Sequence, residues 1–177
     1  MQKSSTQTSS ISSQNYQTNL LRSTEINSQS YEMIISTTNL QKAKNEIHAS
    51  KARPIIVQSQ SLEFNRKILE YGKFDILLSP ELSSKKDRIK QLDSGLNHVL
   101  AKIAAKNKVA IGIDLKSLRE IKDKKQKAQR IARIRQNIKI CRKSLTRLTI
   151  LNPKDSKDAQ AFLLSLGAST QQIKKAI

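Results

Sequence analysis

The chemically most distinctive stretch of this chain is residues 116–147, which hold thirteen basic side chains and two acidic ones, Glu120 and Asp123. A helical stripe of apolar residues runs through it, at three- and four-residue spacing: Ile131, Ile134, Ile138, Cys141 and Leu145. If that stripe faces inward, the basic residues project outward. A row of cations on a rigid helix can follow the repeating phosphates of a nucleic acid. The stretch therefore predicts polyanion binding, with a merely solvated basic face as the alternative.

The predicted contacts with nucleic acid fall in three places along the chain. On the basic helix they are Arg130, Arg133, Arg135, Lys139, Arg142 and Lys143. A polar loop at 81–92 adds Lys85, Lys86 and Arg88, with Lys90 close by. Asn97 and His98 complete the set. His98 lies nearly opposite the apolar stripe of its own predicted helix (Leu96, Val99, Leu100, Ile103, Ala104). We therefore expect it to contact nucleic acid or a partner, or to be solvated.

We predict no catalytic and no metal-binding residue in this chain. Its two histidines, His48 and His98, are far apart in sequence, and neither belongs to a cluster with the spacing of metal ligands. The single cysteine, Cys141, lies on the apolar stripe and is expected in the core. No phosphate-binding glycine loop and no Ser-His-Asp set is present. We therefore expect the protein to bind no cofactor.

Apolar periodicity and cap residues predict the elements that position these side chains. We expect one helix to begin at Asn39 and another at either Asp93 or Ser94. We expect a helix to end at Gly72, and a break near Asp123 to divide the basic stretch into two helices. The strands are expected at 33–35, 55–57, 74–78, 109–113 and 145–151, and the helices at 39–48, 62–71, 94–107, 116–143 in two parts, 158–166 and 170–177. This alternation indicates an α/β fold with a parallel sheet, open or closed into a barrel.

Composition separates the chain into two regions. In residues 1–30, 21 of the side chains are Ser, Thr, Gln or Asn, which predicts a disordered tail, whereas 31–177 are expected to form one domain. The formal charge of +19 and the low aromatic content of 3% favour a nucleic-acid partner over a membrane surface. One cysteine excludes a disulfide framework, and the sequence has no apolar leader or spanning segment, so we expect a cytoplasmic location.

Two blocks of the sequence resemble a known family. Residues 94–115, SGLNHVLAKIAAKNKVAIGIDL, are similar to the signature of ribonuclease P protein component 3, the family that includes the thirty-kilodalton subunit of eukaryotic RNase P. Residues 130–143, RIARIRQNIKICRK, resemble its later signature, and EFNR at 63–66 and DIL at 75–77 are weaker matches. The resemblance covers roughly residues 32–177, and the length of the chain favours an archaeal member.

The resemblance implies a TIM-like (β/α) barrel, which we expect to be incomplete or irregular because a barrel of eight units needs more residues. It also implies a protein subunit of ribonuclease P, which removes the 5′ leader from precursor tRNA. The RNA would carry out catalysis with Mg²⁺, and the protein would stabilise it. The implied partners are RNase P RNA, precursor tRNA, a ferredoxin-like subunit in a heterotetramer, and other RNase P proteins. The alternatives are a metal-dependent phosphoesterase on a related barrel, or a ribosome-associated basic RNA-binding protein.

Deleting residues 1–30 tests the predicted domain boundary. The segment lacks the apolar content to join a core, so its removal should shift the melting temperature by no more than about one or two degrees. Thermal unfolding followed by circular dichroism measures this shift. A loss of many degrees would mean that the segment completes the fold.

Overall fold

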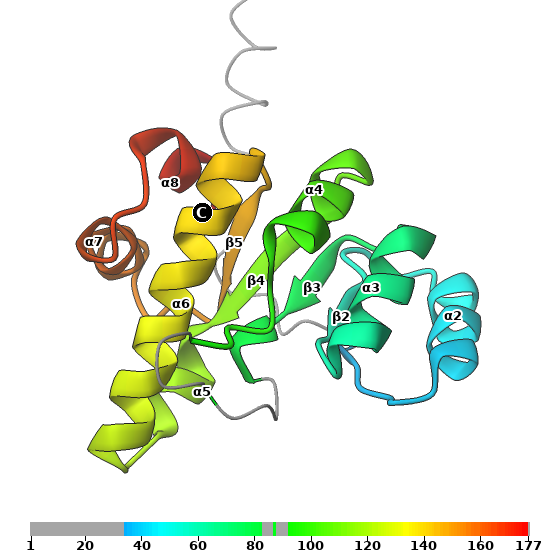
Figure 1. Cartoon of the computed structure of the whole chain (residues 1–177), viewed down its shortest axis with the longest axis horizontal. Helices are drawn as coiled ribbons and strands as arrows, with labels where there is room; N and C mark the ends of the chain where they lie inside the picture. Colours follow the sequence, from blue (N-terminus) through cyan, green and yellow to red (C-terminus); the bar gives the residue numbers. More distant parts are fainter. Residues whose placement is uncertain (1–33, 83–86, 88–91, 177) are drawn as a thin grey trace, which may run out of the picture. The chain divides into compact units, whose positions relative to one another are not determined.

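Five short parallel strands pair in the order in which they occur in the sequence (Figure 1). The structure is a computed structural model, and it describes residues 34–82, 87 and 92–176. The chain divides after Glu32 into two units, and the described residues all lie in the second. The strands are β1 (Ile34–Ile35), β2 (Ile56–Gln58), β3 (Ile76–Leu78), β4 (Ala110–Asp114) and β5 (Leu148–Leu151). The predicted parallel α/β fold is confirmed.

Helices connect these strands at every step, and two more helices follow β5. They are α2 (Leu40–Ala49), α3 (Leu62–Tyr71), the 3₁₀ turn η1 (Pro80–Leu82), α4 (His98–Lys106), α5 (Leu115–Glu120), α6 (Lys124–Ser144), α7 (Ser156–Ser165) and α8 (Thr170–Ala176). The strand order never reverses, as it would in a doubly wound sheet. Successive crossovers of one hand therefore place the connecting helices on one face, which is the winding of a (β/α) barrel. Among the described strands β1 and β5 are the two edges, so the sheet is open.

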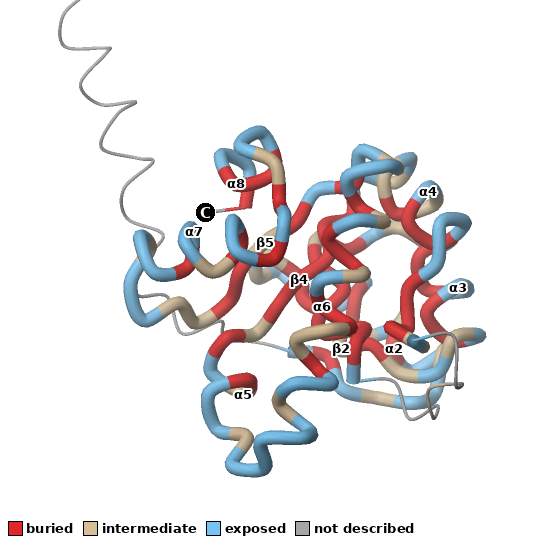
Figure 2. Tube along the Cα trace, turned by 60° about the vertical axis from the view of Figure 1, so that its left-hand side comes forward, coloured by how far each residue is buried: buried red, intermediate tan, exposed pale blue. Residues whose placement is uncertain are grey.

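The two faces of the sheet carry different side chains. Strand register places one set on the face that packs against the helices: Ile35, Val57, Leu77, Ile111, Ile113, Leu148 and Ile150, all of them in the hydrophobic core. The opposite face carries Ile56, Ile76, Leu78, Ala110, Gly112 and Leu151, with Gln58, Asp114 and Thr149 among them. The strands are buried throughout most of their length (Figure 2). Burial on both faces explains why their sequences lack alternation.

Local cap chemistry sets the helix boundaries, and the structure confirms several predicted caps. Asn39 begins α2, and Gly72 ends α3 in a left-handed conformation with φ of 64°. Ser61, a cap that the sequence analysis did not predict, begins α3. The predicted break is present, because Asp123 caps α6 by accepting a hydrogen bond from the Lys125 amide.

Two details of the prediction were wrong. Helix α4 is capped by Asn97 rather than by Asp93 or Ser94, so Leu96 precedes the helix and Val99 is 46% exposed. Leu145 does not continue the inward stripe of α6. It ends the helix with φ of 58° and is 88% exposed.

Some predictions concern residues that the structure does not describe. The tail at 1–30 and the loop cations Lys85, Lys86, Arg88 and Lys90 lie outside the described residues. Within the described part, no helix is both long enough and apolar enough to cross a membrane.

Gly112 allows a close approach at the centre of the sheet, and its substitution tests the packing of the face opposite the helices. A Cβ atom at this position would lie 2.7 Å from Ile76 Cγ2 and 3.2 Å from side-chain atoms of Leu78 and Leu151. Because these neighbours are buried, Gly112→Ala should lower the free energy of unfolding by about 1–3 kcal/mol in urea denaturation. Ala128→Ser, on the exposed surface of α6, is the control and should change it by less than about 0.5 kcal/mol. Equal stabilities of the two variants would contradict this packing.

Candidate nucleic-acid interface

The basic helix α6 has two chemically different sides, and two of the predicted RNA contacts lie on the wrong one. Its buried residues are Arg130, Arg133, Ile134, Asn137, Ile138 and Cys141. The expectation that Arg133 projects outward is wrong, and Arg130 is turned inward as well: the two residues are only 9% and 5% exposed. A buried guanidinium requires a partner, and each of these arginines has one.

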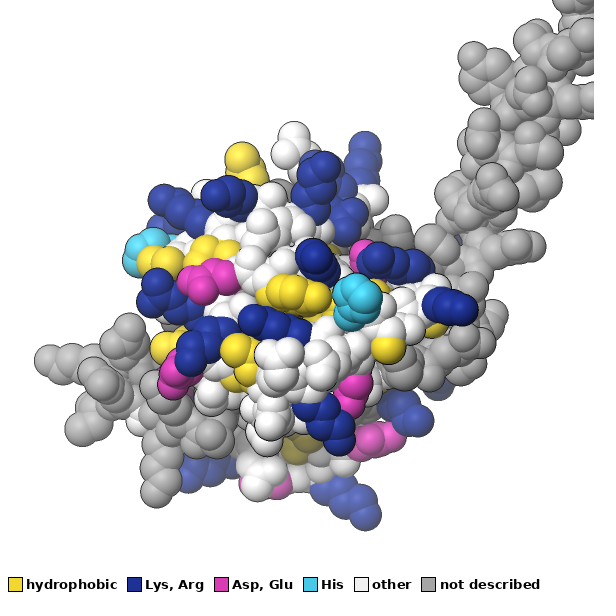
Figure 3. All heavy atoms as spheres, turned by 90° about the vertical axis from the view of Figure 1, so that its right-hand side faces the viewer, with side chains coloured by type: hydrophobic (Ala, Val, Ile, Leu, Met, Phe, Trp, Pro, Cys, Tyr) yellow, Lys and Arg dark blue, Asp and Glu magenta, His cyan; other side chains and the backbone are white. Residues whose placement is uncertain are grey.

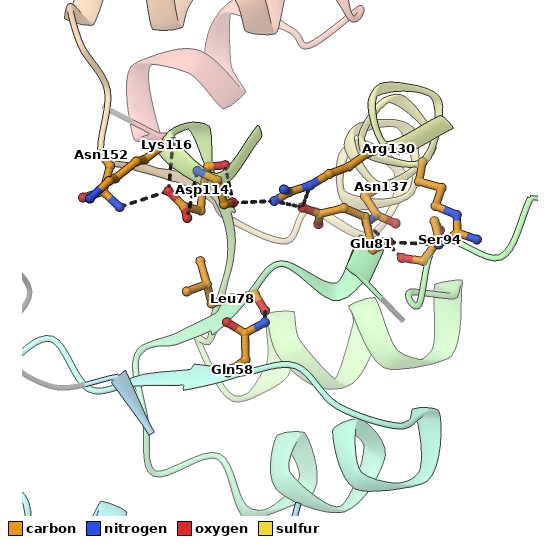
Figure 4. Close-up of polar contacts among 11 residues, drawn as sticks. Gln58, Leu78, Glu81, Ser94, Asp114, Lys116, Arg130, Asn137 and Asn152 are labelled. Atoms are coloured by element: carbon orange, nitrogen blue, oxygen red, sulfur yellow. Dashed lines mark hydrogen bonds and ion pairs between the residues drawn. The ribbon is translucent and has the colours of Figure 1, made fainter. Parts of the chain in front are cut away.

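Arg130 forms a buried ion pair with Glu81, which lies just after β3. Its Nε and Nη2 atoms donate to Glu81 Oε1 at 3.2 and 3.1 Å, and Nη2 also donates to Ser117 Oγ of α5 at 2.9 Å (Figure 4). The side chains of Arg130 and Glu81 are 6% and 1% exposed. Burial raises the pKa of Glu81, while the positive charge of Arg130 acts in the opposite direction. The pair thus joins α6, α5 and the end of β3.

Arg133 fastens the next turn of α6 to the chain that follows β3. Its Nη1 donates to the backbone oxygen of Glu81 at 3.1 Å, and its Nη2 donates to Asp87 Oδ1 at 3.0 Å. Asp87 also accepts hydrogen bonds from the Gln129 side chain and the Asp93 amide. The hydrogen bond from Gln129 is the main cause that lowers the pKa of Asp87, and the contacts from Asp93 and Arg133 act in the same direction. Asp87 is therefore held as an anion beneath the basic helix.

Neutral hydrogen bonds fix the rest of the inner side of α6. Asn137 donates to the backbone oxygen of Ser94, just before α4 (Figure 4). Gln172 of α8 donates to the backbone oxygen of Ile138, and Thr146 donates to that of Ala101 in α4. These contacts determine the rotation of α6 about its axis and therefore which cations face outward.

The outward side of α6 carries the remaining four predicted contacts: Arg135, Lys139, Arg142 and Lys143, all exposed. Arg135, Lys139 and Lys143 are four residues apart, so they form one ridge along the helix. Within the described part of the chain none of the four forms an ion pair; Arg142 makes only a long hydrogen bond, 3.5 Å, to the backbone oxygen of Gly167. Their charges are therefore available to an external anion.

Helix α4 contributes a second exposed ridge next to α6. His98, Lys102 and Lys106 are exposed and also four residues apart, while Leu100, Ala101 and Ala104 are buried on the opposite side. His98 is exposed as predicted. Asn97 has a structural role, because its side chain accepts from the Leu100 amide at 2.9 Å. Lys and Arg side chains are also spread over the face that lies on the α2, α3 and α4 side of the structure (Figure 3).

The carboxyl ends of the strands hold a polar cluster where α/β proteins often place catalytic groups. Here Asp114 accepts from the Asn152 side chain at 3.0 Å and caps α5 through the amides of Lys116 and Ser117 (Figure 4). These hydrogen bonds together lower its pKa against the opposing effect of burial, which is the largest single contribution. Among the described residues no group of three His, Cys, Asp or Glu side chains could hold a metal ion.

Cys141 is buried as predicted. Burial raises the pKa of its thiol to about 12, so that it is protonated at neutral pH and has no nucleophilic thiolate.

The sheet winds sequentially, its polar cluster is engaged in helix capping, and α6 exposes a row of cations. These features define a parallel α/β protein with an exposed basic surface. No family model matches the chain. Ribonuclease P protein component 3 of Methanocaldococcus jannaschii is 31% identical over 134 residues, which cover 72% of this chain and 52% of that protein. The protein of the same name from Methanococcus maripaludis strain C7 is 33% identical over 86 residues, which cover 48% and 34%.

A comparison of folds supports the same family. A chain in the cryo-EM structure of archaeal ribonuclease P with mature tRNA matches 96% of this chain and 73% of its own length, with a TM-score of 0.68 and 25% identity. The chain belongs to the ribonuclease P protein component 3 family, as its two signature blocks predicted. It spans about half the length of the Methanocaldococcus relative and about a third of the Methanococcus one.

The buried ion pair of Arg130 and Glu81 can be tested by a double-mutant cycle. Arg130→Met leaves Glu81 buried without its cation and should lower the free energy of unfolding by about 3–5 kcal/mol. Glu81→Met in the same chain should recover most of that loss, because no unpaired charge then remains. Urea denaturation at neutral pH measures the two single variants, Arg130→Met and Glu81→Met, and the double variant. Arg135→Met, on the exposed side, is the matched control; a loss as large as that of Arg130→Met would show that the inward position of Arg130 is unimportant.

Proposed function

We propose that this chain is a protein subunit of the ribonuclease P ribonucleoprotein and binds the catalytic RNA during removal of the 5′ leader from precursor tRNA. The observation that carries the proposal is the match of 96% of the chain to a component of archaeal ribonuclease P. The exposed cations of α6 support it, because they form no ion pairs among the described residues.

In this proposal the protein holds RNA and performs no chemical step itself. Among the described residues, three side chains that could act as an acid, a base or a nucleophile are already engaged: Glu81 pairs with Arg130, Asp114 caps α5, and Cys141 is a buried, protonated thiol. Catalysis then belongs to the RNA and its Mg²⁺ ions. Phosphate contacts by Arg135, Lys139, Arg142 and Lys143 fix the position of the RNA without reading its sequence.

The proposed assembly contains RNase P RNA, precursor tRNA, a ferredoxin-like subunit paired with this chain in a heterotetramer, and other RNase P proteins. Cytoplasmic location follows from this role. The proposed RNA contacts also include three cations of the loop after η1, Lys85, Lys86 and Arg88, and the residues Asn97 and His98. Arg130 and Arg133 leave that set, because they are engaged within the protein.

Replacing Arg135, Lys139, Arg142 and Lys143 together by Gln tests the proposed RNA surface. Gln nearly matches the helix propensity of Arg and Lys, so far-UV circular dichroism should not change. Each lost phosphate contact should lower the slope of log K against log salt by roughly 0.7–0.9, or on the order of 3 for all four. RNA binding should weaken for unrelated sequences too, and cleavage of precursor tRNA by the reconstituted enzyme should require more protein.

The matched control is a variant with the same loss of charge on α2, α3 and the segments that follow them: Lys42→Gln, Lys51→Gln, Arg66→Gln and Lys73→Gln, all at exposed positions. It should keep the salt slope of the parent protein. An unchanged slope in the α6 variant would mean that these cations face something other than RNA. Failure of the parent protein to stimulate the RNase P RNA would overturn the proposed function itself.

A further inference from the structure

A hollow of about 400 Å³ opens at the amino ends of the strands, away from the polar cluster at their carboxyl ends. Its wall includes the first residues of β3, β4 and β5, the segment before β2, and one side chain of α8. The lining residues are Arg53, Pro54, Asp75, Ile76, Ala110, Arg147, Leu148, Thr149 and Lys175. Ile76, Ala110 and Thr149 belong to the sheet face opposite the helices, so the hollow is separate from the outward side of α6.

The charges around this hollow favour an anion. Three of its lining residues are cations, Arg53, Arg147 and Lys175, against the single carboxylate of Asp75. That carboxylate is already engaged: its Oδ2 accepts from Arg53 Nη1 at 2.9 Å and from the Ile55 amide at 2.7 Å. Within the described part of the chain, Arg147 and Lys175 take part in no ion pair. These two cations therefore face the hollow with their charge uncompensated.

The remaining wall suits a flat apolar group rather than a bare ion. Pro54, Ile76 and Ala110 supply the apolar part of the wall, and Thr149 supplies a hydroxyl group. The Leu148 side chain is buried on the face that packs against the helices. The volume lies within the range of small-molecule pockets, which combine apolar walls with a few convergent polar groups. A nucleotide has both required parts, a charged phosphate and a flat base.

We propose that this hollow binds a nucleotide, with its phosphate on Arg147 and Lys175 and its base against the apolar wall. The nucleotide comes from one of two sources: a free mononucleotide, or one unit of an RNA strand. The RNA source deepens the proposed function and rests on it, whereas the free-nucleotide source is independent of it.

The test titrates the full chain with AMP and, separately, with a five-nucleotide single-stranded RNA, by isothermal titration calorimetry at low salt. Arg147→Gln and Lys175→Gln should each weaken binding roughly tenfold, because each removes a charged hydrogen-bond donor. Both residues are exposed, so both variants should keep the circular dichroism spectrum of the parent. Lys174→Gln, also exposed and adjacent on α8 but not lining the hollow, is the matched control and should bind as the parent does.

Each outcome decides the proposal. AMP binding that both substitutions weaken supports it with a free nucleotide as the ligand, and loss confined to the oligonucleotide supports it with RNA as the ligand. Binding of neither ligand, or binding that Lys174→Gln weakens equally, overturns it. The fourfold α6 variant should still bind AMP like the parent, so a failure of the RNA surface on α6 remains distinguishable from a failure of this hollow.

Discussion

The arrangement of this protein depends on the buried ion pair between Arg130 and Glu81. A charge removed from water is costly unless it is paired and hydrogen-bonded, so neither side chain is stable in its position without the other. Glu81 lies in η1, which follows β3 after a single residue. Its attraction for Arg130 acts together with the buried Ile134, Ile138 and Cys141 to hold the same side of α6 inward. The neighbouring ion pair of Arg133 and Asp87 holds the same side of α6 inward about one turn further along the helix.

The winding of the sheet explains why the basic surface can be broad. Since the strand order does not reverse, α4 and α6 cross the same face of the sheet, and their outer sides point away from the same core. Neighbouring helices α4 and α6 therefore each carry an exposed row of basic side chains: His98, Lys102 and Lys106 on α4, and Arg135, Lys139 and Lys143 on α6. A strand order that reversed would have put some of these helices on opposite faces.

The sequence was sufficient to predict the parallel α/β fold, the five strands, and the helix break at Asp123, because these depend on local periodicity and caps. It was also sufficient to place Ile134, Ile138 and Cys141 in the core. The inward orientation of Arg130 and Arg133 could not be derived in this way. Their partners, Glu81 and Asp87, lie more than forty residues away in sequence, so no local pattern reveals them.

The structure shows why polar side chains complete the inner side of α6. The apolar stripe of α6 is narrow, since Ile131 is only half-buried and Leu145 is exposed, whereas a helix packed against a core normally buries an arc of at least about 100°. In a helix with so few apolar residues, polar side chains must fill the remainder of the buried arc. Two acidic residues near the end of β3, in a chain with 33 basic residues, were the available partners.

The use of arginine rather than lysine at the two inner positions follows from geometry. Arg130 contacts Glu81 and Ser117 at once, and Arg133 contacts Asp87 and the Glu81 backbone at once. A planar guanidinium with five donors can reach such separate acceptors, whereas the ammonium group of lysine is a compact point charge and is more strongly hydrated. On the outer side no such geometry is imposed, and lysine and arginine both occur there. One helix thus uses cations in two ways: the inner ones are neutralised and hold the helix in place, and the outer ones provide the positive field that an RNA backbone would meet.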